Sequence, residues 1–429
     1  MSAAGLSDQN PDAGPSHETL RRATAADLWN SIQAFLLWLD KHGYESYDPY
    51  DVWGTRYGLL SRRIYYGHRL LGLPLIAPVL MMEILCPSWR RWLVSKQRFA
   101  TADAQLLLGF LNLYEAKGET IYLERAKALS RDLLKISVPG YSGYGWGYPF
   151  DWQNNRTLWK KNLPFITATP YCFEAFLRLF DLTADHDFLT TARSIAQFVH
   201  KDLRDTPTSQ DAAAGSYSPA DSSKVVNASA YRAMVLFEAA HRFQIEAYRQ
   251  TAQRNLNFIL QSQNQDGSWF YAVDHASDRF IDHFHTCFVL KNLAKINRRL
   301  KSDAVSGAVA KGYQYYRGAL YNAAGLPKQF AIKPRAQIVQ YEMYDFAEAI
   351  SLGFWLRPEI PEALDVARRL AVMARERYQT VEGFYVTRVY KGGLKHKCPY
   401  LRWPQAQLFY GFTSLALLEA NASRRCAQA

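Results

Sequence analysis

With 429 residues, of which 48% are hydrophobic and 21% charged, the chain has the composition of an ordinary folded soluble protein. Its lysines and arginines exceed its aspartates and glutamates by 12, a balance that favours an anionic partner such as an acidic glycan, an anionic membrane or nucleic acid. The basic residues lie in scattered pairs and no nucleic-acid-binding module is recognisable, so we expect no nucleic acid as a partner.

The first 24 residues are polar and rich in Ser, Ala, Pro and Asp. They lack the apolar core of a secretory signal peptide, and we predict a disordered tail for residues 1–24. The five cysteines are widely spaced and form no Cys-x-x-Cys pair, which is typical of a reducing compartment. The expected location is therefore the cytoplasm, or the periphery of the inner membrane if the next segment contacts lipid.

Residues 70–86 have the sequence LLGLPLIAPVLMMEILC, which is almost entirely apolar and has arginines on both sides. A helix needs about 20 apolar residues to span a bilayer, and this run is shorter and contains Pro74, Pro78 and Glu83. Two interpretations stay open. Residues 70–87 either lie in the membrane interface, so that Leu70–Cys86 contacts a membrane surface, or form a buried helix of the domain.

From about residue 100 onward one pattern recurs with a period of roughly 50 to 65 residues. An amphipathic helix ends, a loop rich in Gly and aromatic residues follows, and a second helix begins with apolar residues at i, i+3, i+4 spacing. The loops begin near residues 140, 216, 266, 325 and 383. Their glycines and alternating aromatic residues predict short β-hairpins.

A helical hairpin cannot bury its apolar stripe alone, so neighbouring hairpins must stack. The last helix, residues 406–420, is too apolar to serve as a polar cap, which favours closure against the first hairpin. We therefore predict an all-α fold in which residues 25–429 form a single domain. This domain is a toroid of five or six helical hairpins, (α/α)5-6, with short β-hairpin loops at one end.

Between residues 100 and 420 the hairpin period and loops such as GYGWGYPFDWQ (143–153) resemble the six-hairpin (α/α) toroid superfamily of carbohydrate-active enzymes. That group includes glycoside hydrolases, polysaccharide lyases and sugar epimerases, and the resemblance implies an active site at the loop end of the ring. Residues 255–269 are also similar to the Q…GxW motif of terpenoid cyclases, which form a related helical toroid. The Asp-rich motifs of those cyclases are not evident here.

Six residues in the loops are candidates for catalysis: Asp151, His283, His285, Glu342, Tyr344 and Asp345. A histidine whose tautomer is fixed by a carboxylate can abstract and return a proton, and two carboxylates in a cleft can serve as acid and base. A tyrosine can do the same if nearby cations lower its pKa. The alternatives are a metal held by the two histidines, a polar helix start, or a helix cap paired with Arg335.

Aromatic and cationic side chains in the same loops are candidates for substrate binding, because rings stack on sugars and arginine binds carboxylates bidentately. These residues are Trp146, Trp152, Lys160, Trp269, Tyr271, Arg388, Tyr390, Arg402 and Trp403. Structural packing of the aromatic loops and a solvated basic loop are the alternatives.

No phosphate-binding loop, GxSxG, HExxH or dinucleotide motif is present, so we expect neither a cofactor nor a resident metal. The leading hypothesis is an enzyme that modifies an acidic polysaccharide or glycolipid by hydrolysis, β-elimination or epimerisation, in bacterial surface-polysaccharide biosynthesis. One alternative is a non-catalytic toroid that binds a glycan or a partner in polysaccharide assembly. Another is an isoprenoid-cyclase-like toroid with an apolar cavity.

Overall fold

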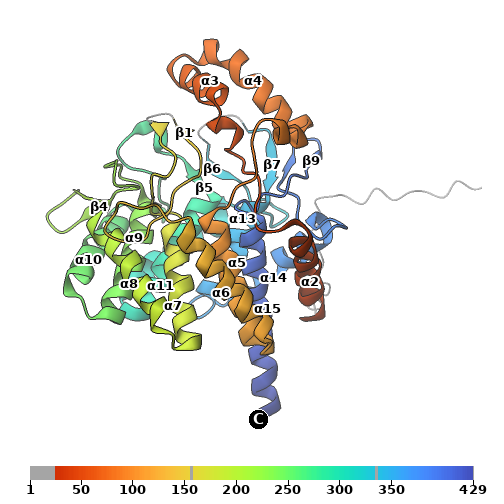
Figure 1. The fold of residues 1–429 in the computed structure, drawn as a ribbon. Helices are drawn as coiled ribbons and strands as arrows, with labels where there is room; N and C mark the ends of the chain where they lie inside the picture. The colour runs from red at the N-terminus through yellow and green to blue at the C-terminus, as the bar shows by residue number, and fades with distance from the viewer. Residues whose placement is uncertain (1–24, 155–157, 334–336, 429) are drawn as a thin grey trace, which may run out of the picture.

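The computed structural model describes residues 25–154, 158–333 and 337–428. The predicted tail, residues 1–24, and Arg335 lie outside the described residues. Within them, twelve helices form two concentric layers (Figure 1). The inner helices are α5 (Ala100–Lys117), α7 (Thr169–Thr183), α9 (Val226–Phe243), α11 (His283–Leu300), α13 (Met343–Leu356) and α15 (Gln405–Gln428). The outer helices are α2 (Ala25–His42), α6 (Thr120–Lys135), α8 (His186–Lys201), α10 (Glu246–Gln261), α12 (Asp303–Ala319) and α14 (Glu362–Met373), which continues into η4 (Ala374–Tyr378).

The inner helices form a closed ring, because each contacts the next and α15 returns to contact α5. Inner helices such as α5 and α13 are buried on nearly every side, as expected of helices that are apolar all round, whereas outer helices such as α8 bury one stripe. The sixth hairpin is made of the two ends of the described chain, because α2 lies against α15. The predicted toroid is confirmed, with six hairpins, and its closure joins the last helix to the first.

Short antiparallel strands gather at the end of the ring where the inner helices begin (Figure 1). The pairs are β1 (Trp152–Gln153) with β2 (Leu158–Trp159), β3 (Asp205–Pro207) with β4 (Ala213–Gly215), and β5 (Ile281–Asp282) with β6 (Phe330–Ile332). A three-stranded sheet contains β7 (Val339–Glu342), β8 (Arg388–Tyr390) and β9 (Lys395–His396). Two of these sheets join neighbouring hairpins of the ring, so they are not the purely local β-hairpins that the loop sequences predict.

Two of the strands run straight into inner helices, β5 into α11 and β7 into α13. Asp282 and Glu342 are therefore the residues at which strand becomes helix. A residue at this position keeps extended backbone geometry and directs its side chain at the first turn of the helix. The loop end of the ring consequently holds several carboxylates at the starts of inner helices.

A separate helical hairpin stands at the loop end, outside the ring (Figure 1, top). It comprises α3 (Arg56–Gly67) and α4 (Arg69–Leu85), between the short helices η1 (Val52–Gly54) and η2 (Pro87–Trp92). Its own small core is formed by Val52, Trp53, Ile76 and Val79. The interpretation of residues 70–87 as a buried helix of the ring is wrong, because Leu70 is 88% exposed and Leu85 is 63% exposed.

Candidate active site

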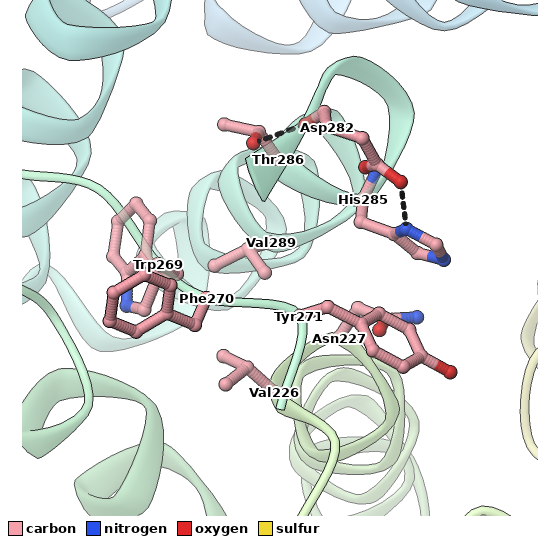
Figure 2. A pocket seen from close by; sticks show the side chains of 9 residues that line it. All are labelled: Val226, Asn227, Trp269, Phe270, Tyr271, Asp282, His285, Thr286 and Val289. Carbon is pink, nitrogen blue, oxygen red and sulfur yellow. Dashed lines mark hydrogen bonds and ion pairs between the residues drawn. The ribbon is translucent and has the colours of Figure 1, made fainter. Parts of the chain in front are cut away.

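A small hollow with a cavity volume of about 10 Å³, room for about one water molecule, opens at the loop end between the first turns of α9 and α11. Figure 2 shows its walls, where the imidazole of His285, the amide of Asn227 and the phenol of Tyr271 lie on one side and the apolar side chains on the other. The nine lining residues are Val226, Asn227, Trp269, Phe270, Tyr271, Asp282, His285, Thr286 and Val289.

His285 and Asp282 form an oriented pair in this hollow. Asp282 caps α11 by accepting the backbone N–H of His285 at 3.0 Å, and its second oxygen, Oδ2, lies 2.6 Å from Nδ1 of His285. This contact holds the proton on Nδ1, so the other ring nitrogen, Nε2, is left with a lone pair. The ring of Tyr271 packs against the imidazole with centroids 4.6 Å apart, and the His285 side chain keeps 22% of its surface exposed. The arrangement suits a general base.

Asn227 is a site residue that sequence reasoning missed. It lies in the first turn of α9 and is 1% exposed, and neither atom of its amide has a hydrogen-bond partner among the described residues. Burying a polar group without a partner is costly, which points to a ligand that completes these bonds. The only sequence signal is an amide between apolar residues at a helix start.

Glu342 and Asp345 are buried at the start of α13. Glu342 accepts a hydrogen bond from Nε1 of Trp403 at 3.0 Å, and its other oxygen lies 3.0 Å from Nε of Arg388. Burial raises the pKa of Glu342, and the Arg388 charge opposes that rise.

Asp345 is 1% exposed, and its Oδ1 has no hydrogen-bond partner within the described ranges. Burial, followed by the charges of Glu342 and Asp282, raises the pKa of Asp345 well above its ordinary value. A raised pKa favours the protonated form of the Asp345 carboxyl, which is the form that a general acid requires.

An aromatic wall adjoins these carboxyl groups. The rings of Tyr344 and Trp403 stack in parallel with centroids 3.7 Å apart, and Phe284 meets both edge to face at 5.3 Å. Phe284 also touches His285, with ring centroids 4.3 Å apart. The wall thus connects the His285–Asp282 pair to Glu342 through direct contacts.

Six hairpins whose inner helices form a closed ring, with loops and carboxylates at one end, are the defining geometry of one fold. The chain is an (α/α)6 toroid. Solved structures with the same fold include an unsaturated glucuronyl hydrolase from Bacillus sp. GL1, with 12% identity and a TM-score of 0.59 over 92% of this chain and 96% of that one. A family 76 α-mannanase from Bacteroides thetaiotaomicron has 11% identity and a TM-score of 0.58 over 77% and 88% of the two chains. A cellobiose 2-epimerase from Bacillus thermoamylovorans has 11% identity and a TM-score of 0.57 over 75% and 88%.

No protein-family profile matches the sequence of the toroid, and no curated protein matches it by sequence. The structural likeness therefore establishes the fold, and the chemistry has to be argued from the residues of this chain.

His283, a predicted catalytic residue, does not face the hollow. Its Nδ1 lies 3.2 Å from the carbonyl oxygen of Leu320, and its Nε2 lies 2.8 Å from the hydroxyl of Tyr316. It is completely buried, and burial lowers its pKa to about 3. Both ring nitrogens are occupied within the protein, so we exclude His283 from the proposed chemistry. The metal alternative also loses one of its two histidines, and the described residues contain no cluster of three His, Cys, Asp or Glu able to hold a metal ion.

Tyr344 lies at the site, but its surroundings disfavour the phenolate that catalysis would need. Burial is the largest effect on this phenol, and it raises the pKa of Tyr344 well above the ordinary value of 10.0. The condition for catalysis by Tyr344, a pKa lowered by nearby cations, is therefore not met, and the role left for Tyr344 is to stack against Trp403.

Arg402 is also at the loop end, but it already has a carboxylate partner. Its Nε and Nη2 lie 2.5 and 2.8 Å from the two oxygens of Asp48, a residue that sequence reasoning missed. The guanidinium carbon lies 4.7 Å from the ring centroid of Tyr148 and 5.5 Å from that of Tyr50. Trp152 packs on the same Tyr50 ring at 5.4 Å, so Trp152 and Arg402 belong to one cluster.

The remaining predicted residues have structural partners. Asp151 accepts the backbone N–H of Lys161 at 2.6 Å and lies 3.7 Å from Nζ of Lys160, so the two predicted residues pair beside the β1–β2 turn. The indoles of Trp146 and Trp269 are buried and donate to backbone carbonyls at 2.8 and 2.9 Å. Tyr390 is 5% exposed in strand β8.

A larger hollow, with a cavity volume of about 490 Å³, lies toward the opposite end of the ring and is lined by all six inner helices. Its charged groups largely neutralise one another, as in the pairs Lys295–Glu174 at 2.5 Å and Arg242–Asp181 at 2.7 Å. The buried pair of Lys291 and Glu348 lies between the inner helices α11 and α13. Because the oriented histidine His285 and the buried carboxyl of Asp345, with its raised pKa, are both at the loop end, we assign the candidate active site there.

Proposed function

We propose that this toroid is a carbohydrate-active enzyme whose reaction is a proton transfer at the loop end. The observation that carries the proposal is the 2.6 Å contact of Asp282 with Nδ1 of His285, at the same end of the ring as the buried carboxyl of Asp345, whose pKa is raised by burial. A base with a free lone pair and an acid with a proton to give are both needed for general acid–base catalysis. The charge of Asp282 is one of the lesser causes that raise the pKa of Asp345, after burial and Glu342, which supports a coupling between the two carboxyl groups.

In the proposed reaction, Nε2 of His285 takes a proton from the sugar or from water, and the carboxyl of Asp345 donates one to the departing or adjacent oxygen. Abstraction from a carbon next to a carboxylate, with loss of the glycosidic oxygen, is β-elimination. Return of a proton to the other face of the same carbon is epimerisation, and abstraction from water is hydrolysis. The buried stack of Tyr344 on Trp403 holds the indole that donates a hydrogen bond to Glu342.

We infer that the substrate is an acidic glycan or a glycolipid. The chain has a formal net charge of +12, which favours anionic substrates, and the carboxylate-rich site itself would repel them without that excess. The glucuronyl hydrolase that shares the fold degrades glycosaminoglycan, which is also acidic. We propose a role in surface-polysaccharide biosynthesis beside a membrane, which fits this substrate class.

A non-catalytic glycan-binding toroid is the second candidate, because the orphaned amide of Asn227 indicates a ligand without indicating a reaction. The isoprenoid-cyclase-like alternative is not proposed, since it requires an apolar cavity and the loop-end walls carry His285, Asp282 and Asn227.

The test is to incubate the protein with oligosaccharides that contain uronic acids, in deuterated water. Deuterium gained at C5 reports epimerisation, the ultraviolet absorbance of an unsaturated uronate reports elimination, and new reducing ends report hydrolysis. We expect His285→Gln and Asp345→Asn each to lower kcat by about 10²–10⁴ while glycan binding persists. His186→Gln, an exposed histidine on α8, is the matched control. Binding without turnover in the native protein would establish the second candidate instead.

A further inference from the structure

We propose that residues 56–93, which form α3, α4 and η2, dock this protein onto the surface of an anionic lipid bilayer. These residues are called the docking hairpin. The hairpin projects from the loop end and stands clear of the ring (Figure 1). This inference goes beyond the catalytic proposal, because it concerns a surface that takes no part in the proton transfer.

The outward face of the docking hairpin is apolar to an extent found nowhere else on the described surface. Eleven of the eighteen large hydrophobic side chains that are exposed belong to residues 57–93. They are Tyr57, Leu60, Leu70, Leu71, Leu73, Leu80, Met81, Leu85, Trp89, Trp92 and Leu93. Contiguous apolar patches of this kind mark interaction surfaces, because leaving them in water has a free-energy cost.

The outward face is not a core that has been left open by poor packing. Helix α4 already buries one complete stripe, Gly72, Ile76, Val79 and Glu83, at 4-3-4 spacing. Gly72 lies so close to Tyr65 of α3 that an added Cβ would come within 2.1 Å of the backbone. The second stripe, which includes Leu70, Leu73 and Met81, points away from that packed face, so α4 is apolar on both sides while only one side has a partner in the chain.

The charges of the docking hairpin select an anionic lipid surface rather than a neutral protein partner. Five cations on or beside it are exposed: Arg56, Arg63, Arg69, Arg91 and Lys96. The sequence from residue 52 to residue 98 has one acidic residue, Glu83, and that carboxylate is buried and paired with Arg90. An exposed surface that combines cations, tryptophans and leucines without carboxylates has the composition of a segment that lies in the headgroup region.

The docking hairpin lies on the membrane and does not cross it. In the described part of the chain, no helix is both long enough and apolar enough to span a bilayer. Helix α4 has 17 residues, or about 25 Å at 1.5 Å per residue, and contains Pro74 and Pro78. A short apolar helix of this kind is suited to partial burial in the interface.

A buried ionic network fixes the docking hairpin to the ring. Arg90 is fully buried and pairs with Glu83 and with Asp51, the latter at 3.2 Å. Its guanidinium lies 4.6 Å from the ring centroid of Tyr400, whose hydroxyl donates to Glu83 at 3.2 Å. Tyr400 lies two residues before Arg402 and three before Trp403, at the loop end of the ring. Docking would therefore hold the candidate active site beside the lipid headgroups. That last step rests on the proposed function, and it favours a lipid-linked glycan as substrate.

The test is sedimentation of the full-length protein with vesicles of phosphatidylcholine, either alone or mixed with phosphatidylglycerol. We expect the protein to bind the mixed vesicles and to bind the neutral ones much more weakly. Leu70→Asp with Leu71→Asp, two positions that are 88% and 69% exposed, should lower binding by about tenfold or more. Arg63→Gln, Arg69→Gln and Arg91→Gln together should weaken binding by about fivefold for each charge, and less so at high salt.

Matched controls use equally exposed residues elsewhere: Leu37→Asp with Ile121→Asp, and Arg131→Gln with Lys201→Gln and Arg249→Gln. These should bind vesicles as the native protein does. The proposal is overturned if the native protein stays in the supernatant, or if the Leu70/Leu71 variant binds vesicles as well as the native protein does. It is also overturned if the native protein is a dimer that does not bind vesicles and the variant is a monomer, because the apolar face would then be a dimer interface. Turnover of a soluble oligosaccharide is unaffected in the docking variants, so failure of the docking proposal and failure of the catalytic proposal give different results.

Discussion

Asp48 and Arg402 lie 354 positions apart in the sequence and form a buried bidentate ion pair at the loop end. Asp48 follows the first helix of the ring and Arg402 precedes the last, so the pair links the two segments that meet where the ring closes. Neither partner has an obvious signal in the sequence, since each is one of many acidic or basic residues.

We predict that Asp48→Ala destabilises the fold strongly. It leaves the Arg402 guanidinium buried without its carboxylate, which typically costs about 3–5 kcal/mol of unfolding free energy. Urea denaturation measures this loss. Glu246→Ala breaks an exposed pair with Arg249 and should cost about 1 kcal/mol or less, so equal losses in the two variants would contradict the assigned role of Asp48.

Asn227→Leu should have opposite effects on stability and on binding. It removes two buried amide atoms that lack partners among the described residues, so the unfolding free energy should rise by about 1–2 kcal/mol. The same change removes hydrogen-bonding groups from the hollow, and glycan affinity should fall. Asn255→Leu is the control, because the Asn255 amide is bonded to Ala213, Asp205 and Arg232, and its loss should destabilise. A destabilised Asn227→Leu variant would show that Asn227 is structural.

Acid should destabilise the protein through two buried histidines. Burial is the largest cause that lowers the pKa of His283 to about 3 and that of His396 to about 2. Below pH 6.5, the ordinary pKa of histidine, these two side chains become protonated in the unfolded chain but stay neutral in the folded protein. The unfolding free energy therefore falls with decreasing pH by about 1.4 kcal/mol per pH unit for each histidine. For His283→Gln, chemical denaturation between about pH 6 and about pH 4 should give an unfolding free energy whose change per pH unit is smaller by about 1.4 kcal/mol. An unchanged slope would mean that His283 is protonated in the folded state.

Asp345 should act in the opposite direction. Its folded-state pKa is raised above the ordinary 3.8, so the folded protein holds a proton that the unfolded chain loses as the pH rises. This contribution to stability is complete below about pH 3.8 and is lost as the pH rises through the raised pKa. Asp345→Asn removes the titrating group and with it this pH-dependent loss of stability. The melting temperature of the variant should therefore fall less than that of the native protein between acidic and neutral pH. If the melting temperatures of the native protein and the variant changed equally with pH, the raised pKa of Asp345 would be contradicted.

The pH dependence of turnover gives a separate test of the same carboxyl group. If Asp345 donates a proton, kcat/KM of the native enzyme declines as the pH rises through the Asp345 pKa. The residual activity of Asp345→Asn should lack this alkaline decline. Persistence of the decline in the variant would assign the acid to another group, with Glu342 the next to examine because its pKa is also raised.

The sequence predicted the ring because the evidence for it is local. Apolar residues at helical spacing and glycines at the loop starts repeat along residues 100–420, and each hairpin has to bury its stripe against a neighbour. The apolar run at residues 70–86 was also evident. Its position on the outside of the ring was not, since a buried helix and an interfacial helix have the same composition.

The candidate site depended on geometry that no local pattern contains. His283 and His285 are two residues apart at the start of α11, so their side chains are about 200° apart around the helix axis. One is turned toward Tyr316 of the outer layer, and the other toward Asp282 and the hollow. Strand β5 sets that rotation by pairing with β6, which belongs to the next hairpin.

What the sequence determined by itself was a closed ring of helical hairpins with polar and aromatic loops and one unusually apolar segment, because periodicity and composition act over a few residues. The tertiary structure alone decided which side chains reach the mouth of the ring, which charges are already neutralised, and which apolar face is left exposed. These depend on pairs such as Asp48–Arg402 and Glu83–Tyr400, whose formation requires the ring to close and the docking hairpin to pack against it.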